Sequence, residues 1–397
     1  MAEKIPKYIF DGYLRCSGTK DTDVLMILNQ DLLNTKKKMV ALFRDGHFVP
    51  AKTGAAVSIL GMLNALYTNG NYMPVVIKCK REHDLLEDYK DIKFPIVFVD
   101  EEKFYYDKNN ILSNFFIKNN ISIIHLGSSE AVLSMADTFG NRFKYVFEVH
   151  NVDADLYRQL GKKQSEIDYI ANTEKDAIKI CDCALFRSND DVKKYESLLI
   201  PKNEVNNFRK KVRVYRGGID TNTVKFTPDL NINNDLVFMG HLNYEPNIKC
   251  LENINNYILG KISNNIRAVG LCKVETQEKF KGIHFTGYVK DINIALKNTF
   301  IGLAPITEAS GTRLKVLDYL AKGLPVLATS LATEGLEKEI YDIVWVENDL
   351  NKYPNRIEEI KKAWTPEISK KNRDVLEDLR DWKNVIIDVI LAYDSIY

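Results

Sequence analysis

The chain has 397 residues, with 55 basic and 54 acidic side chains and a formal net charge of +1. This length exceeds what one compact core usually organises, so it predicts two domains of roughly 200 residues each. The balanced charge gives no sign of bulk nucleic-acid binding, and the six scattered cysteines form neither a disulfide framework nor a zinc motif.

The first residues, MAEKIPKYIFDG, lack the apolar core of a secretory signal, and no later stretch approaches about 18 uninterrupted apolar residues. We therefore expect a cytoplasmic protein that touches membranes only peripherally, if at all. A basic cluster could meet an anionic lipid surface, although a solvated edge is the favoured interpretation. The cluster comprises Arg209, Lys210, Lys211, Arg213 and Arg216.

The N-terminal half alternates short apolar runs with helical patterns. Residues 1–35 are interpreted as an extension with one helix over residues 23–33. After it, the pattern predicts strands at residues 39–43, 75–77, 95–99, 121–126, 145–149 and 184–186, and helices at residues 55–66, 131–139 and 173–181. Strands and helices that alternate at these lengths predict a parallel, doubly wound sheet.

The same pattern begins again after a polar linker at residues 221–235, with strands predicted at residues 236–240, 267–271 and 283–285. We therefore predict an N-terminal Rossmann-like domain at residues 36–220 and a C-terminal one at 221–371. A last helix at 372–397 is expected to cross back to the N-terminal domain. Two such domains leave a cleft where the strand ends of both sheets can face a ligand.

One stretch of the C-terminal half carries the strongest chemical signal. Residues 300–336 read FIGLAPITEASGTRLKVLDYLAKGLPVLATSLATEGL, which predicts a strand, a glycine-containing loop, a helix ended by Gly323, and another strand. The unpaired amide groups at the start of that helix favour an anion, and Arg313 and Lys315 add two cations. Lys315 and Asp318 are three residues apart and share one helix face. A phosphate-binding cation beside a carboxylate for sugar hydroxyls suits a nucleoside diphosphate, although a solvated helix face remains open.

These residues and several others resemble the two-domain retaining glycosyltransferases of the GT-B fold, most closely glycosyltransferase family four (glycosyl transferases group one). In the C-terminal half the similar segments are LVFMGHLNYEPNI at residues 236–248, FTGYVKD at 285–291 and the donor block at 311–336. In the N-terminal half they are IIH at 123–125, FEVHNVD at 147–153 and VYRGGID at 214–220. The resemblance runs from about residue 36 to the end of the chain.

The resemblance implies an α/β protein in which two Rossmann-like domains face an interdomain cleft. It also implies transfer of a sugar from a nucleoside diphosphate sugar to an acceptor hydroxyl of a glycan, glycoconjugate or small molecule, with retention of configuration. No metal and no further cofactor are expected. The residues that the resemblance and the donor block assign to catalysis are His150, Arg313 and Lys315. Those assigned to the donor are Gly54, Gly240, His241, Glu308, Ser310, Gly311, Thr312 and Asp318.

This chain also departs from the family pattern. Ser310 stands at the first acidic position of the donor block, and Glu308 is a candidate replacement for it. His241 and Pro246 stand where basic residues are common, and Gly217 replaces the usual hinge asparagine. These departures keep two other functions open: a nucleotide-sugar epimerase of the same fold, and a degenerate, non-catalytic protein that binds a sugar or a partner.

Other polar residues are given structural interpretations. His125 and Glu130 are interpreted as packing and helix-start residues. The Asp-x-Asp pairs Asp21/Asp23 and Asp153/Asp155 are interpreted as helix caps rather than metal ligands.

Overall fold

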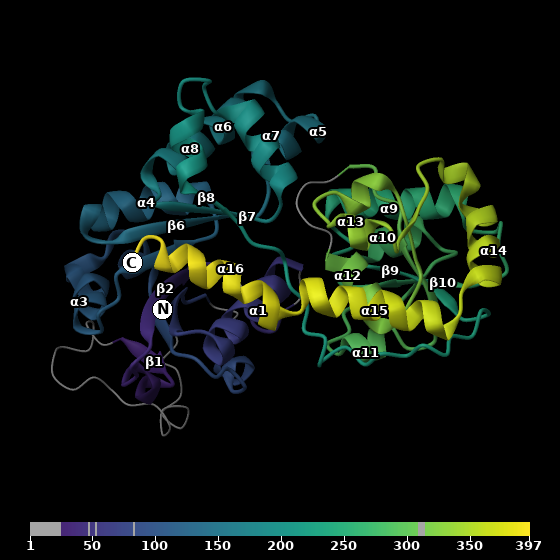
Figure 1. Cartoon of the computed structure of the whole chain (residues 1–397), viewed down its shortest axis with the longest axis horizontal. Helices are drawn as coiled ribbons and strands as arrows, with labels where there is room; N and C mark the ends of the chain where they lie inside the picture. The colour runs from purple at the N-terminus through teal and green to yellow at the C-terminus, as the bar shows by residue number, and fades with distance from the viewer. Residues whose placement is uncertain (1–24, 47, 52–53, 82–83, 309–313) are drawn as a thin grey trace.

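The computed structural model describes residues 25–46, 48–51, 54–81, 84–308 and 314–397. These residues form two α/β domains, each with its own sheet and its own hydrophobic core (Figure 1). The predicted fold class is confirmed.

The N-terminal sheet has eight strands in the order β1-β4-β3-β2-β5-β6-β7-β8. Every neighbouring pair is parallel except β1 and β4. The strands are β1 (Met26–Leu28), β2 (Lys38–Arg44), β3 (Tyr72–Cys79), β4 (Ile96–Val99), β5 (Ile123–Leu126), β6 (Lys144–Val149), β7 (Cys183–Phe186) and β8 (Val212–Val214). The strand order reverses between β2 and β5, and ligands of open α/β sheets bind at the strand ends beside such a reversal.

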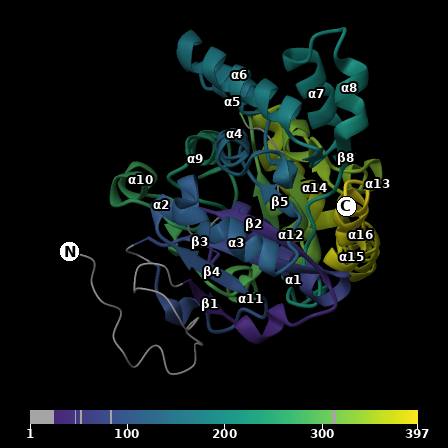
Figure 2. The same ribbon diagram turned by 90° about the vertical axis from the view of Figure 1, so that its left-hand side faces the viewer.

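Helices cover both faces of this sheet, and α5 to α8 gather at one end of the domain (Figure 2). The helices are α1 (Gly54–Asn69), α2 (Glu101–Tyr106), α3 (Ile111–Lys118), α4 (Ser129–Phe139), α5 (Asp153–Gln159), α6 (Gln164–Ile180), α7 (Asn189–Leu199) and α8 (Val205–Lys211). The predicted helices at residues 55–66, 131–139 and 173–181 lie within or overlap α1, α4 and α6.

The predicted helix at residues 23–33 is wrong over the part that the structure describes. Residues 26–28 form β1, an antiparallel edge strand on β4, and a short 3-10 helix follows at Gln30–Leu33. Ile27 and Leu28 are buried in the N-terminal core. Asn29 then turns the chain with a φ of 53° and donates from its side chain to the Ile92 carbonyl at 2.8 Å. Pairing to β4 therefore overrides the local helical pattern, and residues 25–35 join the N-terminal domain rather than an extension.

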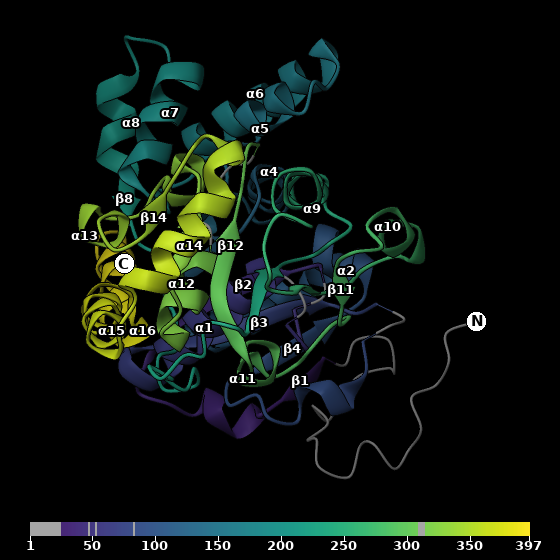
Figure 3. The ribbon, with the colours of Figure 1, turned by 90° about the vertical axis from the view of Figure 1, so that its right-hand side faces the viewer.

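The C-terminal sheet has six parallel strands in the order β11-β10-β9-β12-β13-β14, which reverses between β9 and β12. Figure 3 shows α12 on one side of β12 and α9 on the other. The strands are β9 (Asp235–Met239), β10 (Ile266–Val269), β11 (His284–Phe285), β12 (Thr299–Ala304), β13 (Val326–Ala328) and β14 (Trp345–Val346). The helices are α9 (Glu245–Tyr257), α10 (Val274–Lys279), α11 (Ile292–Ala295), α12 (Leu314–Lys322), α13 (Lys338–Tyr341), α14 (Tyr353–Ala363) and α15 (Pro366–Arg380). Gly323 follows α12 with a φ of 95°, as predicted for a glycine that ends this helix.

The last part of the chain crosses from one domain to the other (Figure 1). It is not one helix over residues 372–397. Instead, α15 packs on the C-terminal core and α16 (Trp382–Asp394) packs on the N-terminal core, with Asp381 between them. Trp382 lies so close to Gly61 of α1 that a Cβ atom there would be 2.2 Å from the indole Nε1. The close approach of α1 and α16 therefore requires glycine at this position.

Polar contacts also join the two domains. Lys194 of α7 forms ion pairs with Asp155 at 3.2 Å and with Glu334 of the C-terminal domain at 3.1 Å. Beside the Lys194–Glu334 ion pair, a hollow of about 540 Å³ lies between Asp190 of α7 and residues 330–341. None of the helices in the described part of the chain combines the length and the apolar character needed to cross a bilayer.

Candidate active site

A cluster of buried polar side chains lies at the carboxyl ends of the N-terminal strands. Arg44 is the last residue of β2, His125 lies in β5, Glu148 lies in β6, and Arg187 directly follows β7. His150, the predicted catalytic histidine, follows β6 directly. Parallel strands end at one edge of a sheet, so residues that are far apart in the sequence meet here.

Glu148 is the centre of this cluster. Its side chain is fully buried, and its carboxylate accepts hydrogen bonds from Arg187 Nη2 at 2.7 Å and from His125 Nε2 at 3.1 Å. The Tyr215 hydroxyl also donates to Glu148, and Arg44 Nη2 lies 3.4 Å away. A buried carboxylate is stable only with such partners. Burial by itself would raise the pKa of Glu148, but the charge of Arg187 and the hydrogen bond from His125 hold it well below its ordinary value.

Both histidines of the cluster are neutral at pH 7. Burial lowers the pKa of His125, and it lowers the pKa of His150 to about 4, with help from Arg187. The side chain of His150 keeps 23% of its surface exposed, whereas His125 is fully buried. His150 is therefore the histidine of this cluster that a ligand can reach.

The contacts of His150 define its tautomer. Arg187 Nη2 donates to His150 Nδ1 at 3.1 Å, so the ring proton is on Nε2. Nε2 lies 3.5 Å from the carboxylate of Glu148. A Cβ atom on Gly127 would lie 3.2 Å from this nitrogen and 2.6 Å from Arg44 Nη1, so a glycine follows β5 where the ring packs. The imidazole can donate a hydrogen bond from Nε2 but is unsuited to act as a strong base.

The C-terminal domain contributes a second cluster around the turn after β9. Lys315, the second residue of α12, donates from Nζ to Asn247 Oδ1 at 2.9 Å, and its ammonium group lies 4.1 Å from the centre of the Phe238 ring. Asn247 in turn donates to the His241 carbonyl at 3.0 Å and packs on Gly240, where a Cβ atom would lie 2.8 Å from its amide nitrogen. The structure thus brings Lys315, predicted to be catalytic, together with Gly240 and His241, predicted to bind the donor.

The start of α12 lies against the N-terminal domain. A Cβ atom on Gly54, the first residue of α1, would lie 3.9 Å from Leu314 Cδ1. One on Gly217 would lie 3.2 Å from Leu314 Cδ2 and 3.5 Å from Arg187 Nη1. The glycines at positions 54 and 217 therefore let α12, which we call the donor helix, approach the edge of the N-terminal sheet near the Glu148 cluster.

Two predicted donor residues lie apart from these contacts. Glu308 is half-buried at the end of the segment after β12, and Asp318 is half-buried on α12. Within the described residues, no hydrogen bond or ion pair joins either side chain to the rest of the site. Burial raises the pKa of Asp318 to about 7. Four predicted residues, Ser310, Gly311, Thr312 and Arg313, lie outside the described residues, so their assignments remain predictions.

We expect Asp318→Asn to stabilise the protein above pH 7 and to weaken nucleotide binding. The pKa of Asp318 rises from 3.8 to about 7 on folding, so its ionisation costs stability as the pH increases through this interval. Ribose hydroxyl groups would stabilise the carboxylate, so affinity for a nucleoside diphosphate should rise with pH through about 7. The variant should bind this ligand about 10–100-fold more weakly at pH 8 and lose this pH dependence.

Calorimetric titration with a nucleoside diphosphate and thermal unfolding, each at several pH values, would check both effects. Asp342→Asn is a suitable control, because Asp342 is an exposed partner of Lys338 in the same domain. If Asp318→Asn and the wild type bind the nucleoside diphosphate equally well at pH 8, Asp318 is not part of the donor site.

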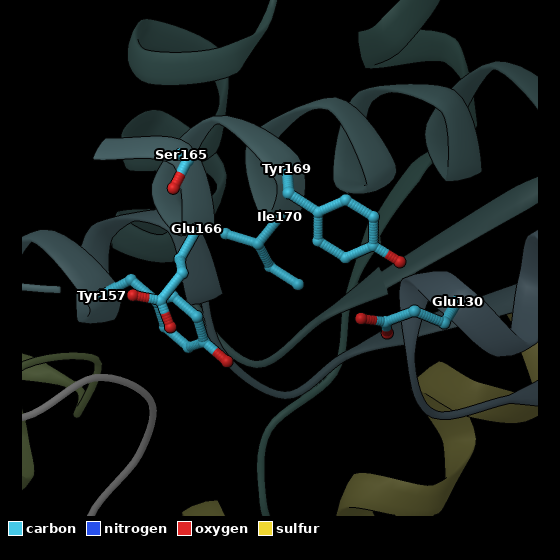
Figure 4. Close-up of a pocket in the computed structure, with 6 residues that line it drawn as sticks. All are labelled: Glu130, Tyr157, Ser165, Glu166, Tyr169 and Ile170. Carbon is cyan, nitrogen blue, oxygen red and sulfur yellow. The ribbon is translucent and has the colours of Figure 1, made fainter. Parts of the chain in front are cut away.

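A shallow hollow of about 280 Å³ lies on the N-terminal side of the site. Figure 4 shows the residues that surround it, which come from α4, α5 and α6. They are Glu130, Tyr157, Ser165, Glu166, Tyr169 and Ile170. Because α5 begins three residues after His150, the hollow lies near the end of β6. Its lining combines aromatic rings with hydrogen-bond acceptors.

A search of the described residues finds no group of three or more His, Cys, Asp or Glu side chains that could hold a metal ion. Asp153 and Asp155 are in the first turn of α5, and Asp155 pairs with Lys194. Asp21 and Asp23 lie outside the described residues.

The two domains with parallel sheets give this chain the GT-B fold. Residues 233–362, which make up most of the C-terminal domain, match the family described as glycosyl transferases group 1. The C-terminal domain therefore carries the sequence features of that family. No curated protein matches the chain.

Solved structures with low sequence identity share the whole fold. Sucrose-phosphate synthase from Thermosynechococcus elongatus is 14% identical, with a TM-score of 0.70 over 91% of this chain and 99% of that chain. Anabaena HepE in complex with UDP and glucose is 12% identical, with a TM-score of 0.67 over 90% and 100%. TarM from S. aureus, solved with UDP, fondaparinux and alpha-GlcNAc-glycerol, is 9% identical, with a TM-score of 0.70 over 90% and 100%. These likenesses show the GT-B fold.

The sequence predicts His150 as a site residue, but it did not predict the residues that contact this histidine. His125 was interpreted as a packing residue, yet it donates a hydrogen bond to Glu148. Glu148 itself could have been noticed, because a carboxylate inside the apolar run of β6 requires a buried partner. Arg44, Arg187 and Asn247 gave no comparable signal.

Proposed function

We propose that this protein is a retaining glycosyltransferase that transfers a sugar from a nucleoside diphosphate sugar to an acceptor hydroxyl, without a metal ion. One observation carries the proposal: Leu314 at the start of α12 and Arg187 at the edge of the N-terminal sheet both lie beside Gly217. A donor on α12 would therefore present its sugar to His150. Uridine is the base we favour, since related structures contain UDP.

The charges of the site suit a departing diphosphate. Arg44 and Arg187 flank the single carboxylate of Glu148, and both histidines are neutral, so one positive charge is in excess. Lys315 adds an ammonium group from the donor helix, and the resemblance adds Arg313. Such fixed cations stabilise negative charge that develops as the bond breaks. His150 would donate from Nε2 to the donor sugar.

In the proposed reaction the bond between the sugar carbon and the phosphate oxygen breaks. The acceptor oxygen forms its new bond to the same carbon from the same face, and its proton passes to the departing phosphate oxygen. This route needs no carboxylate nucleophile from the protein. The hollow lined by Tyr157 and Tyr169 is our candidate for the acceptor side, because it lies on the N-terminal domain and is lined by α5, which begins three residues after His150.

The test combines ligand binding with turnover. A panel of nucleoside diphosphates and their sugars is screened by thermal shift, where a ligand at a hundred times its Kd adds about 2.7 kcal/mol of stability. The stabilising donor is then incubated with and without acceptors. We expect release of the nucleoside diphosphate and acceptor-dependent product. Conversion of the nucleotide sugar alone would indicate an epimerase, and binding without any turnover would indicate a non-catalytic protein.

We expect transfer to survive EDTA. In the proposal, the diphosphate charge is met by Lys315, Arg187 and helix amides, so removal of divalent ions should change kcat/KM by less than about twofold. The check is an assay with chelator, followed by addition of Mn²⁺ or Mg²⁺. Activity that disappears with EDTA and returns with either ion would refute the metal-free assignment.

A further inference from the structure

We propose that Tyr393, near the end of α16, is a positioning residue for His150 and Arg187, and that it acts through His125 and Glu148. The inference rests on the proposed function, because His150 and Arg187, the residues that Tyr393 would position, have their roles in sugar transfer only under that proposal. Tyr393 reaches the site only because the end of the chain returns to the N-terminal domain (Figure 1).

A continuous line of buried contacts connects Tyr393 to the candidate active site. The Tyr393 hydroxyl lies 2.6 Å from His125 Nδ1, and His125 Nε2 lies 3.1 Å from Glu148 Oε2. Tyr393, His125 and Glu148 each have no exposed surface. The carboxylate of Glu148 then holds Arg187 at 2.7 Å, and Arg187 holds His150 Nδ1 at 3.1 Å.

The protonation states of Glu148 and His125 determine which group donates and which accepts in each of these hydrogen bonds. Glu148 is ionised and can only accept, so His125 must donate to it from Nε2. His125 is neutral, so its Nδ1 carries a lone pair and accepts the proton of the Tyr393 hydroxyl. The Tyr393 hydroxyl therefore stabilises the tautomer of His125 that carries its proton on Nε2 and donates it to Glu148.

Loss of the Tyr393 hydroxyl would leave His125 Nδ1 buried and unpaired. Such a nitrogen gains a proton more readily, and protonated His125 would draw Glu148 away from Arg187 and His150. The groups that act on His125 are Glu148, which favours its charged form, and Arg44, Arg187 and His150, which surround the same carboxylate. The expected signature is a defect that grows as the pH falls.

The first experiment compares Tyr393→Phe with Tyr72→Phe. Both changes remove one phenolic oxygen from the same ring pair, whose centres are 5.1 Å apart. The Tyr72 hydroxyl donates instead to Asp394 of α16, at 2.8 Å. We expect Tyr393→Phe to lower kcat about tenfold with KM for the donor within about twofold, and to move the acid limb of the pH profile upward. Tyr72→Phe should leave both unchanged. Equal effects of the two variants would mean that Tyr393 only docks α16.

A double-mutant cycle tests the route through His125. His125→Gln can keep the N–H donor to Glu148 while removing Nδ1, so in this background Tyr393→Phe should cause no further loss of kcat. Additive losses would overturn the route.

Histidine NMR tests the same inference without any turnover, so it separates failure of this proposal from failure of the proposed function. With ¹⁵N-labelled histidine, His125 should show the Nε2-protonated tautomer between about pH 5 and 8, and titrate only in Tyr393→Phe. The chain has six histidines, so single substitutions can assign the signals. An Nδ1-protonated His125 in the wild type would overturn the proposal.

Discussion

Replacing Glu148 by glutamine is expected to lower the free energy of unfolding by about 3–5 kcal/mol, the usual cost of removing one partner from a buried charge network. The change keeps the shape of the side chain but leaves Arg44 and Arg187 without their counter-ion. The amide nitrogen of glutamine cannot accept a hydrogen bond, so either the bond from His125 or the bond from Tyr215, which reach different carboxylate oxygens, is also lost. Chemical denaturation of the variant and the wild type would measure the loss.

The pH dependence offers an independent check. The folded-state pKa of Glu148 is well below its ordinary value, so its contribution to stability is present above that value and is lost as the pH falls. Glu148→Gln should lack this part of the acid sensitivity. The control is Glu196→Gln, which breaks a two-bond contact to the exposed Arg209 and should cost less than about 1 kcal/mol. Similar losses for both variants would show that the cluster does not depend on the Glu148 charge.

The second large effect is expected from Lys315. Lys315→Ala should lower kcat/KM about 100-fold, the order seen when one preorganised charge-stabilising group is lost. The hydrogen bond to Asn247 and the contact with the Phe238 ring hold the Lys315 ammonium group in place. A charge with fixed geometry loses little freedom when the diphosphate forms, so more of its attraction reaches the transition state. Steady-state kinetics with the donor identified by thermal shift would measure the effect.

Three comparisons sharpen this result. Arg313→Ala is expected to lower kcat/KM by about 100-fold or more, since a guanidinium can bind phosphate through two hydrogen bonds. Among the Arg313, Lys315 and His241 variants, His241→Ala should have the smallest effect on kcat/KM. Lys370→Ala, which removes an exposed partner of Asp374 on α15, should be neutral. Near-normal transfer by the Arg313→Ala, Lys315→Ala double mutant would mean that the phosphates bind elsewhere.

Much of the fold was predictable because it depends on local, repeating signals. Buried strands of a parallel sheet read as continuous apolar runs, and β2, β6, β9 and β12 were all recognised in this way. The donor helix was predicted from its apolar spacing and from Gly323 behind it. The edge strand β1 was missed because only its pairing with β4, some 70 residues away in the register Met26↔Phe98, makes those residues extended.

For the candidate site, the sequence by itself determined which residues end the strands and which helix bears the cations, because those features are local. It could not show that β2, β5, β6 and β7 bring Arg44, His125, Glu148 and Arg187 around one carboxylate, or that α16 returns Tyr393 to them. A buried charge is tolerated only where its partners converge in space, and strand order and helix crossing decide that convergence. Only the tertiary structure could therefore reveal what holds His150 in place.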